Sequence, residues 1–385
     1  MSAAPQSDKK KLDPHGLSDS YRAQAQEELA RTFVSIQEIV LAARRTLSPA
    51  VWDMLSGGSD SETTLRRNRA ALDSLALRQR VLVNVSNIDM SSSLLGHRMP
   101  FPVFIAPIGN YLQQADPLGA LPVARAAAAA GVPCFVSTAA KPSIEEVAAG
   151  APNIPLVFQL YVRSDRKWVA DILDRAKAAG YGALCVTVDR AFYSRRERDL
   201  LNRHLVREGG NQTFQMSMTW DDVVWMKSHM KLPLILKGIA TAEDARLAVE
   251  HGADVVYVSN HGGRQLDCGQ ASIEVLPEVA AAVDGRAEVV MDGGICRGTD
   301  VVKALALGAR AVGIGKLYGW ALAAAGEAGV RRLLELLEVE VRTVMGLMGV
   351  TSLQELNPSF VKPSLVVSSG KVTGPFPWFE EQSGI

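Results

Sequence analysis

Short apolar runs alternate with helix-like segments along most of the chain. Eight runs have the continuous apolar character of strands that are buried on both faces. They cover residues 102–109, 132–138, 155–162, 183–189, 233–239, 255–260, 288–294 and 311–316. The intervening segments, such as LGALPVARAAAAAG and RKWVADILDRAKAAG, have helical spacing. This alternation predicts parallel strands that are connected by helices.

Eight strand–helix units predict an α/β fold, a (β/α)8 TIM barrel with a short N-terminal helical extension. The alternative is a doubly wound open sheet, which usually carries a GxGxxG loop after its first strand. Here the first strand is followed by APIGNY, which lacks that loop. We place the barrel domain at residues 35–365, a polar tail with a short helix near its end at 1–34, and a C-terminal tail at 366–385.

Composition narrows the function classes. The chain has 385 residues with 41 basic and 41 acidic side chains, so it lacks the basic excess of a nucleic-acid-binding protein. The four cysteines are scattered without a CxxC pair, which favours neither a metal site nor a disulfide framework and indicates a reducing, cytoplasmic location. The polar N-terminus and the lack of a long apolar run predict no membrane association.

A TIM barrel builds its active site at the carboxyl ends of its strands, and all eight predicted strands end in polar residues or glycines. The ends contain Gly109, Asn110, Ser137, Thr138, Gln159, Tyr161, Thr187, Asp189, Lys237, Asn260, His261, Asp292, Gly293, Gly294, Gly315 and Lys316. A single polar strand end is routine, whereas eight of eight indicate a functional site.

The motifs at these ends resemble those of the FMN-dependent 2-hydroxy acid oxidase and dehydrogenase family. They are FQLYV, TVDRAFYSRRERDLLNR, LILKG, SNHGGRQLD, DGGICRGTD and GIGK. The family includes glycolate oxidase, lactate oxidase and mandelate dehydrogenase, and the resemblance extends over residues 35–360. It implies a TIM barrel, FMN without a metal, a small 2-hydroxy acid as substrate and a homo-oligomer, a tetramer in the family.

The resemblance also implies catalytic and substrate-binding roles. His261 corresponds to the family's base, a task that suits a group whose pKa is near neutrality. Asp189 corresponds to its carboxylate partner, and Tyr161 to a tyrosine that acts beside the substrate. Arg196 and Arg264 correspond to the arginines that bind the substrate carboxylate, which a guanidinium can hold through two hydrogen bonds.

Cofactor contacts follow from the same resemblance. Lys237 matches the lysine whose cation stabilises negative charge on the reduced flavin. The remaining positions expected to contact FMN are Ser137, Gln159, Thr187, Ser259, Asp292, Gly293, Gly294, Arg297, Gly315 and Lys316. The glycines of this set allow backbone amides to approach the phosphate closely. Asp267, at the end of the SNHGGRQLD motif, is expected to hold its loop.

The sequence departs from the family pattern in four respects: the residue at Met54, the phosphate-binding positions Cys296 and Lys316, the residue at Ala139, and the loop after the fourth strand. Met54 replaces a tyrosine that binds the substrate carboxylate, and a thioether donates no hydrogen bond. Cys296 replaces a phosphate-binding arginine, with Arg297 next to it, and Lys316 replaces another arginine. Ala139 replaces the tryptophan of glycolate oxidase-like members, which enlarges the space for the C2 substituent. The loop after the fourth strand is short, which opens the site.

We expect FMN-dependent oxidation of an (S)-2-hydroxy acid, with a bulky or aromatic C2 substituent favoured. Because of Met54, a modified substrate that is not a simple hydroxy acid remains an alternative on the same barrel. A flavin-binding protein without turnover is a third interpretation, but it would not need a base with a charge partner. Hydride and carbanion routes, and oxygen or another final electron acceptor, stay open at this point.

Overall fold

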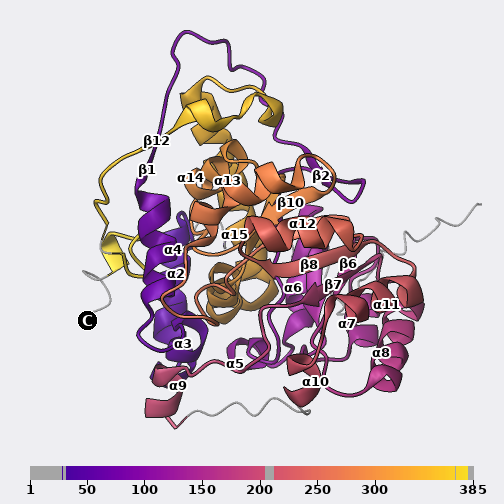
Figure 1. The fold of residues 1–385 in the computed structure, drawn as a ribbon. Helices are drawn as coiled ribbons and strands as arrows, with labels where there is room; N and C mark the ends of the chain where they lie inside the picture. Colours follow the sequence, from indigo (N-terminus) through magenta and orange to yellow (C-terminus); the bar gives the residue numbers. More distant parts are fainter. Residues whose placement is uncertain (1–27, 29–31, 204–211, 369, 380–385) are drawn as a thin grey trace, which may run out of the picture.

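A closed barrel of eight parallel strands forms the centre of the molecule (Figure 1). The computed structural model describes residues 28, 32–203, 212–368 and 370–379. The strands are β4 (Val103–Ile105), β5 (Cys134–Ser137), β6 (Leu156–Leu160), β7 (Ala183–Thr187), β8 (Leu234–Ile239), β9 (Val255–Val258), β10 (Glu288–Met291) and β11 (Ala311–Ile314). Each lies within one of the eight predicted runs, and β11 pairs with β4 to close the ring. The predicted (β/α)8 TIM barrel is therefore confirmed.

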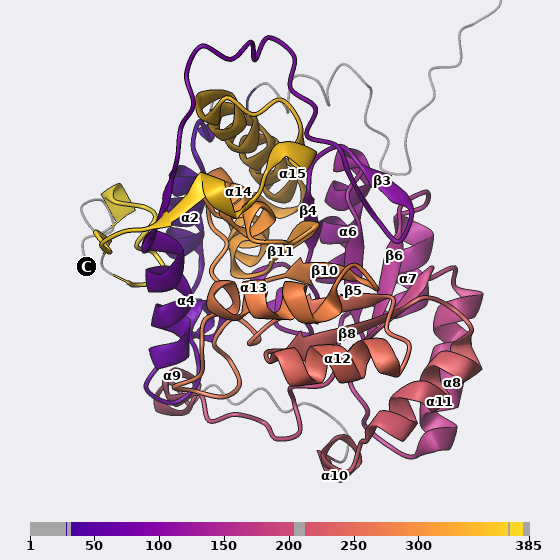
Figure 2. The same ribbon diagram turned by 45° about the horizontal axis from the view of Figure 1, so that its top comes forward.

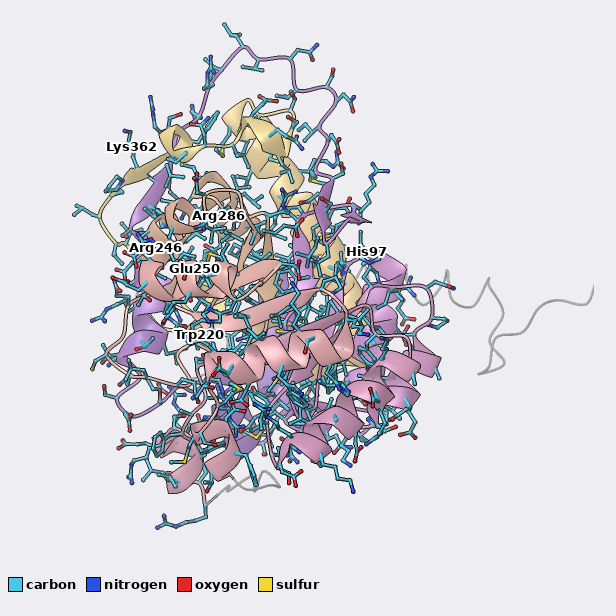
Figure 3. The ribbon with its side chains drawn as sticks, turned by 45° about the vertical axis from the view of Figure 1, so that its right-hand side comes forward. His97, Trp220, Arg246, Glu250, Arg286 and Lys362 are labelled. Carbon is cyan, nitrogen blue, oxygen red and sulfur yellow. The ribbon has the colours of Figure 1, made fainter. Side chains whose placement is uncertain are left out.

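Helices connect successive strands and cover the outside of the barrel. They are α5 (Leu112–Ala115), α6 (Ala120–Ala130), α7 (Ile144–Gly150), α8 (Arg166–Ala178), α9 (Glu197–Leu201), α10 (Gln212–Met216), α11 (Trp220–Met230), α12 (Ala242–Glu250), α13 (Ser272–Val283), α14 (Gly298–Ala306) and α15 (Lys316–Met348). On α12 the amphipathic pattern is plain: Ala245 and Ala248 are buried, whereas Arg246 and Glu250, both labelled in Figure 3, are exposed. One apolar face per helix is what a layer packed on a barrel requires.

Aromatic side chains fill the barrel interior. Phe104, Phe135 and Tyr257 are fully or almost fully buried, and their ring centres lie 4.8 to 5.9 Å apart. Gly313 makes room for them, because a Cβ at this position would lie 2.5 Å from the Tyr257 hydroxyl and 2.9 Å from the Phe104 ring. These side chains make the barrel interior a packed core rather than a channel.

Additional elements precede and follow the barrel. They are α2 (Ile36–Thr46), α3 (Pro49–Ser56), α4 (Thr63–Asp73), β1 (Leu75–Leu77), β2 (Ser92–Leu94), β3 (His97–Met99), the 3-10 turns η1 (Leu353–Glu355) and η2 (Pro358–Phe360), and β12 (Val361–Pro363). The β2–β3 hairpin places Leu94 and Met99 in the apolar cluster inside the barrel. Strand β12 returns to pair antiparallel with β1 beside α4 (Figure 2). Most of the predicted polar tail, with its helix, lies outside the described residues.

The C-terminal segment differs from the tail that was predicted from residue 366. Phe376 and Phe379 are 1% and 5% exposed, and the Phe379 ring stacks on Trp52 of α3 at 5.7 Å. Trp52 in turn stacks on Trp320 of α15, at 5.5 Å. Figures 1 and 2 both show this segment beside α2 and α4. Residues 370–379 therefore belong to the folded domain, because their aromatic side chains complete its outer core.

Within the described residues, none of the helices combines the length and the apolar character that crossing a bilayer would require.

The packing of the C-terminal segment gives a stability prediction. Replacing Phe376 with alanine should lower the free energy of unfolding by about 3 kcal/mol, because truncating a buried aromatic leaves a cavity. The control is Trp378→Ala, since Trp378 is 55% exposed and two residues away; its cost should stay below about 1 kcal/mol. Denaturant unfolding of both variants measures the difference. Equal stability of the Phe376 variant and the wild type would contradict this packing.

Candidate active site

His261 lies at the centre of a hydrogen-bonded group at the carboxyl ends of three strands. Its Nδ1 is 3.1 Å from an Asp189 carboxylate oxygen, and its Nε2 is 3.1 Å from the Tyr161 hydroxyl. Tyr161 follows β6, Asp189 follows β7 and His261 follows β9. An ionised carboxylate can only accept a hydrogen bond, so the Nδ1 of His261 carries the hydrogen. In the neutral ring, Nε2 then has a free lone pair. The three residues predicted to be catalytic are thus brought together.

Glycines permit this arrangement at two points. Gly238 has φ +110°, and a Cβ there would lie 2.6 Å from the Cβ of Asp189. Gly263 has φ +74°, and a Cβ there would lie 2.5 Å from the Leu65 Cα of α4. Side chains at either position would displace the aspartate or the loop that carries His261.

Asp267 holds the end of the same loop. Its carboxylate accepts hydrogen bonds from the Thr64 amide at 2.8 Å and from the Ser61 hydroxyl at 2.7 Å. Burial alone would raise the pKa of Asp267. The hydrogen bond from the Ser61 side chain, together with those from nearby backbone amides, lowers the pKa to about 2. The structural role expected of this aspartate is confirmed.

The electrostatic surroundings keep His261 neutral near pH 7. Burial lowers the pKa of His261 below its ordinary value of 6.5, the Asp189 carboxylate opposes this shift, and the nearby Lys237 and Arg196 cations add to it. Burial raises the pKa of Asp189, but His261 and Lys237 outweigh it, so the pKa lies below 3.8. A neutral imidazole beside an ionised carboxylate is the resting state of a general base.

A buried lysine, Lys237, lies close enough to His261 for its charge to act on the imidazole. Lys237 is 3% exposed, and its ammonium donates to the Ser259 hydroxyl at 2.7 Å and lies 3.3 Å from the Asp292 carboxylate. Burial alone would lower the pKa of Lys237, yet Asp292 and Asp189 raise it above 10.5. The site therefore holds a permanent cation at this depth.

Two arginines, Arg264 and Arg196, line the same cavity as His261. Arg264 donates to the carbonyls of Met54, at 2.7 Å, and Gly57, at 3.0 Å, at the C-terminal end of α3. Burial lowers the pKa of Arg264, and repulsion by Arg196 lowers it further. Arg196 is 5% exposed and donates to the Tyr193 hydroxyl at 2.9 Å. Arg196 is buried and Arg264 is half-buried, and the two like charges repel each other at the cavity wall.

These groups surround a cavity with an empty volume of about 1110 Å³, including the space that opens to solvent. Most of the predicted site residues line it: Met54, Tyr161, Arg196, Lys237, His261, Arg264, Asp292, Gly293, Gly294, Gly315 and Lys316. The wall does not include the predicted residues Ser137, Ala139, Gln159, Thr187, Asp189 and Ser259. Ala139 packs on the wall residue Gly109, where a Cβ would lie 2.8 Å from that of Ala139.

Arg297 differs from the prediction. Its guanidinium pairs with Glu340 of α15 at 2.8 Å and also donates to the Pro375 carbonyl at 3.3 Å. Unlike its neighbour Cys296, it is not part of the cavity wall. The one-residue offset from the family's arginine turns the side chain toward α15, so Arg297 connects α14, α15 and the C-terminal segment.

Three polar side chains that line the cavity have no role assigned from the sequence: Arg69, Tyr111 and Arg190. Arg190 lies next to Asp189 in the TVDRAFYSRRERDLLNR motif, and Tyr111 follows the strand end at Gly109 and Asn110, so both are close to positions that the motifs indicate. Arg69 lies on α4, outside the barrel, where its polar stretch gave no signal. Its guanidinium donates to Asp300 at 2.8 Å and to the Gly294 carbonyl at 2.7 Å. Burial lowers the pKa of Arg69, but Asp300 outweighs it and keeps the group charged.

The cavity has the features that FMN requires. A Cβ at Gly315 would meet nothing within 4 Å, so the N-terminal end of α15, where an anion is stabilised, adjoins open space. Lys316 lines the same corner, and burial together with Arg264 and Arg196 lowers its pKa well below 10.5, a shift that an anion would reverse. The Gln159 Oε1 atom is buried and accepts no hydrogen bond from the described residues, so it is able to accept one from a ligand.

Comparisons with known proteins agree with this geometry. The model of the FMN-dependent dehydrogenase family matches residues 43–210 and 205–363. An L-lactate oxidase from Nostoc sp. is 42% identical over 85% of this chain and 98% of its own length. A peroxisomal (S)-2-hydroxy-acid oxidase from Oryza sativa subsp. japonica is 42% identical over 85% of this chain and 95% of its own length.

Solved structures give the same result. A crystal structure of mandelate oxidase with 3,3-difluoro-2-hydroxy-3-phenylpropionic acid superimposes with a TM-score of 0.81 at 43% identity, covering 87% of this chain and 100% of the other. Identity at this level over nearly the whole fold shows more than a shared barrel. The chain belongs to the FMN-dependent dehydrogenase family, with FMN as its cofactor.

Proposed function

We propose that this protein oxidises an (S)-2-hydroxy acid to the 2-oxo acid, with FMN as the immediate electron acceptor. The observation that carries the proposal is the placement of His261. It lines the cavity together with Arg196 and Arg264, its Nδ1 is held by Asp189, and its Nε2 is 3.1 Å from the Tyr161 hydroxyl. A base with a charge partner beside an anion-binding pair fits proton removal from a bound hydroxy acid.

The side chains divide the work. Arg196 and Arg264 bind the substrate carboxylate, which orients C2 and its hydroxyl toward His261. His261 Nε2 accepts a proton, and Asp189 stabilises the imidazolium that results. Bound FMN supplies the two-electron acceptor, and the Lys237 cation stabilises negative charge there. In a hydride route the proton comes from the hydroxyl and in a carbanion route from C2, and His261 serves either.

We also propose which residues hold FMN. The phosphate is bound at Gly293, Gly294, Gly315 and Lys316, and the ring system lies toward Lys237. We propose that Ser137, Gln159, Thr187 and Ser259 contact the flavin ring. The buried, unpartnered Gln159 Oε1 supports this placement, because burying an acceptor without a donor is costly.

The proposed substrate carries a bulky or aromatic group on C2. Gly109 and Ala139 lie against each other where a larger side chain would reduce the space. The similarity to mandelate oxidase supports the same preference. The short loop after β7 adds to this proposal, although residues 204–211 lie outside the described part of the chain.

Met54 motivates a second candidate. It is fully buried in the cavity wall and offers no hydrogen-bond donor from its side chain. A modified hydroxy acid with an apolar group at this point would also fit. For either substrate we propose a cytoplasmic homo-oligomer that acts without nucleic acid or membrane. The scattered cysteines support the location, and the family resemblance supports a tetramer.

Substrate size can be tested with anaerobic flavin bleaching by glycolate, lactate and mandelate. The wild type should prefer mandelate, since burying a phenyl ring contributes on the order of 2 kcal/mol, or about thirtyfold in kcat/KM. Ala139→Trp should reverse the preference toward the small acids. Ala149→Trp is the control, because Ala149 is exposed on α7. A wild type that prefers glycolate would contradict the proposed pocket, and a flavin that no hydroxy acid bleaches would refute the proposed function.

Replacing His261 with glutamine should leave FMN bound and slow flavin reduction by about 10²–10⁴-fold, because the general base is lost. Stopped-flow absorbance measures the reduction, and the visible spectrum of the denatured supernatant measures FMN content. His229→Gln serves as the matched control, since His229 is on α11 and pairs with Asp174. Reduction at the wild-type rate in the His261 variant would show that another group accepts the proton.

Asp189→Asn should change the pH dependence of flavin reduction. His261 accepts a proton only when it is neutral. The wild-type rate should therefore decrease as the pH is lowered through the pKa of His261, which lies below 6.5. Removing the carboxylate that raises this pKa should move the acidic limb to still lower pH and reduce the maximal rate about 10²-fold. Asp171→Asn, at an exposed position on α8, should leave the profile unchanged. A limb that moves to higher pH would contradict the assigned charge coupling.

A further inference from the structure

A phenol outside the recognised motifs contacts both arginines of the cavity. Tyr111 follows β4, is 8% exposed and lines the cavity together with Arg196 and Arg264. The guanidinium carbon of Arg264 lies 5.2 Å from the centre of the Tyr111 ring, and that of Arg196 lies 5.6 Å from it. The tyrosine is therefore held at the point where the substrate carboxylate is proposed to bind.

The hydroxyl of Tyr111 is oriented by its neighbours. Arg196 Nη1 donates to the hydroxyls of both Tyr111 and Tyr193, and the two hydroxyl oxygens are 2.7 Å apart. A phenol that accepts from a guanidinium becomes a stronger donor itself, because the cation polarises its O–H bond. When Tyr193 donates to Tyr111, the Tyr111 proton is available to an anion in the cavity.

Met54 makes such a donor necessary. Its position corresponds to a carboxylate-binding tyrosine in the family, yet its side chain is fully buried and cannot donate. Only its backbone carbonyl takes part in the site, as an acceptor for Arg264. The wall contributed by α3 thus positions an arginine but offers the substrate no hydroxyl.

We propose that the Tyr111 hydroxyl donates a hydrogen bond to the substrate carboxylate and replaces the donor that is missing at Met54. This inference rests on the proposed function of the same cavity. Tyr111 then belongs to the substrate-binding residues, and Tyr193 is a positioning residue that acts through it. The carboxylate is bound by two cations and one phenol, as a family member with the usual tyrosine would bind it, but the phenol comes from the loop after β4.

The test is the affinity of the FMN-loaded protein for benzoylformate, measured without turnover from the change in flavin absorbance. Tyr111→Phe should weaken binding by about 10- to 100-fold, the range for a lost hydrogen bond to a charged group. Tyr193→Phe should weaken it much less. Tyr181→Phe is the control, because the Tyr181 hydroxyl is buried against the Ile144 carbonyl outside the cavity wall. FMN content is measured for each variant, so that loss of fold is recognised.

Rescue gives the second readout. In the Tyr111→Phe background, Met54→Tyr should restore most of the lost affinity by supplying a donor from α3. Unchanged affinity in Tyr111→Phe would overturn the inference. Equal losses in Tyr111→Phe and Tyr193→Phe would also overturn it, since the pair would then act only by holding Arg196. These outcomes are separate from the proposed function, which fails instead if the wild-type flavin is not reduced by any hydroxy acid.

Discussion

Mutual repulsion between buried cations is the constraint around which the cavity is organised. Arg196 lowers the pKa of Arg264, and both arginines lower the pKa of Lys316, in each case in addition to the effect of burial. Burying cations close to one another is costly unless negative charge balances them. Under the proposed function, the substrate carboxylate and the FMN phosphate add that negative charge, so ligand binding would stabilise the folded protein.

Opposite charges are paired in the deeper part of the same site. Lys237 lies 3.3 Å from the Asp292 carboxylate, Asp189 adds to the stabilisation of its charge, and Asp189 also holds His261. These charges keep the pKa of Lys237 above 10.5 and that of Asp189 below 3.8 despite burial. The pairing also separates two tasks, since the lysine stays positively charged while the imidazole stays neutral. Gly238 contributes by lacking the side chain that would collide with Asp189.

Strand ends carried most of the information that sequence analysis could use. The alternation of apolar runs with helical segments predicts the positions of all eight strands. Because the strands of a closed parallel barrel have their carboxyl ends at the same end of the barrel, His261, Asp189 and Tyr161 are expected to lie close together. Side-chain direction was not accessible in the same way. Arg297 is next to the position of the family's arginine, but its guanidinium pairs with Glu340 of α15 and is not part of the cavity wall. Arg69 reaches the cavity from α4 through tertiary packing that no local pattern records.

The aromatic C-terminal segment was misjudged for a related reason. Its prolines and glycines are typical of a tail, and only the stacked Trp52 and Trp320, distant in sequence, give Phe376 and Phe379 a surface to pack on.

Val372 of that segment lines the same cavity as Met54 of α3. The wall is therefore assembled from residues separated by most of the chain, and it is complete only after synthesis has passed Val372. During translation the strands can form in order, but this part of the wall is added only when synthesis reaches Val372. The motifs at the strand ends finish at Lys316, so the last stretch of the chain completes a cavity whose motifs are all made before it.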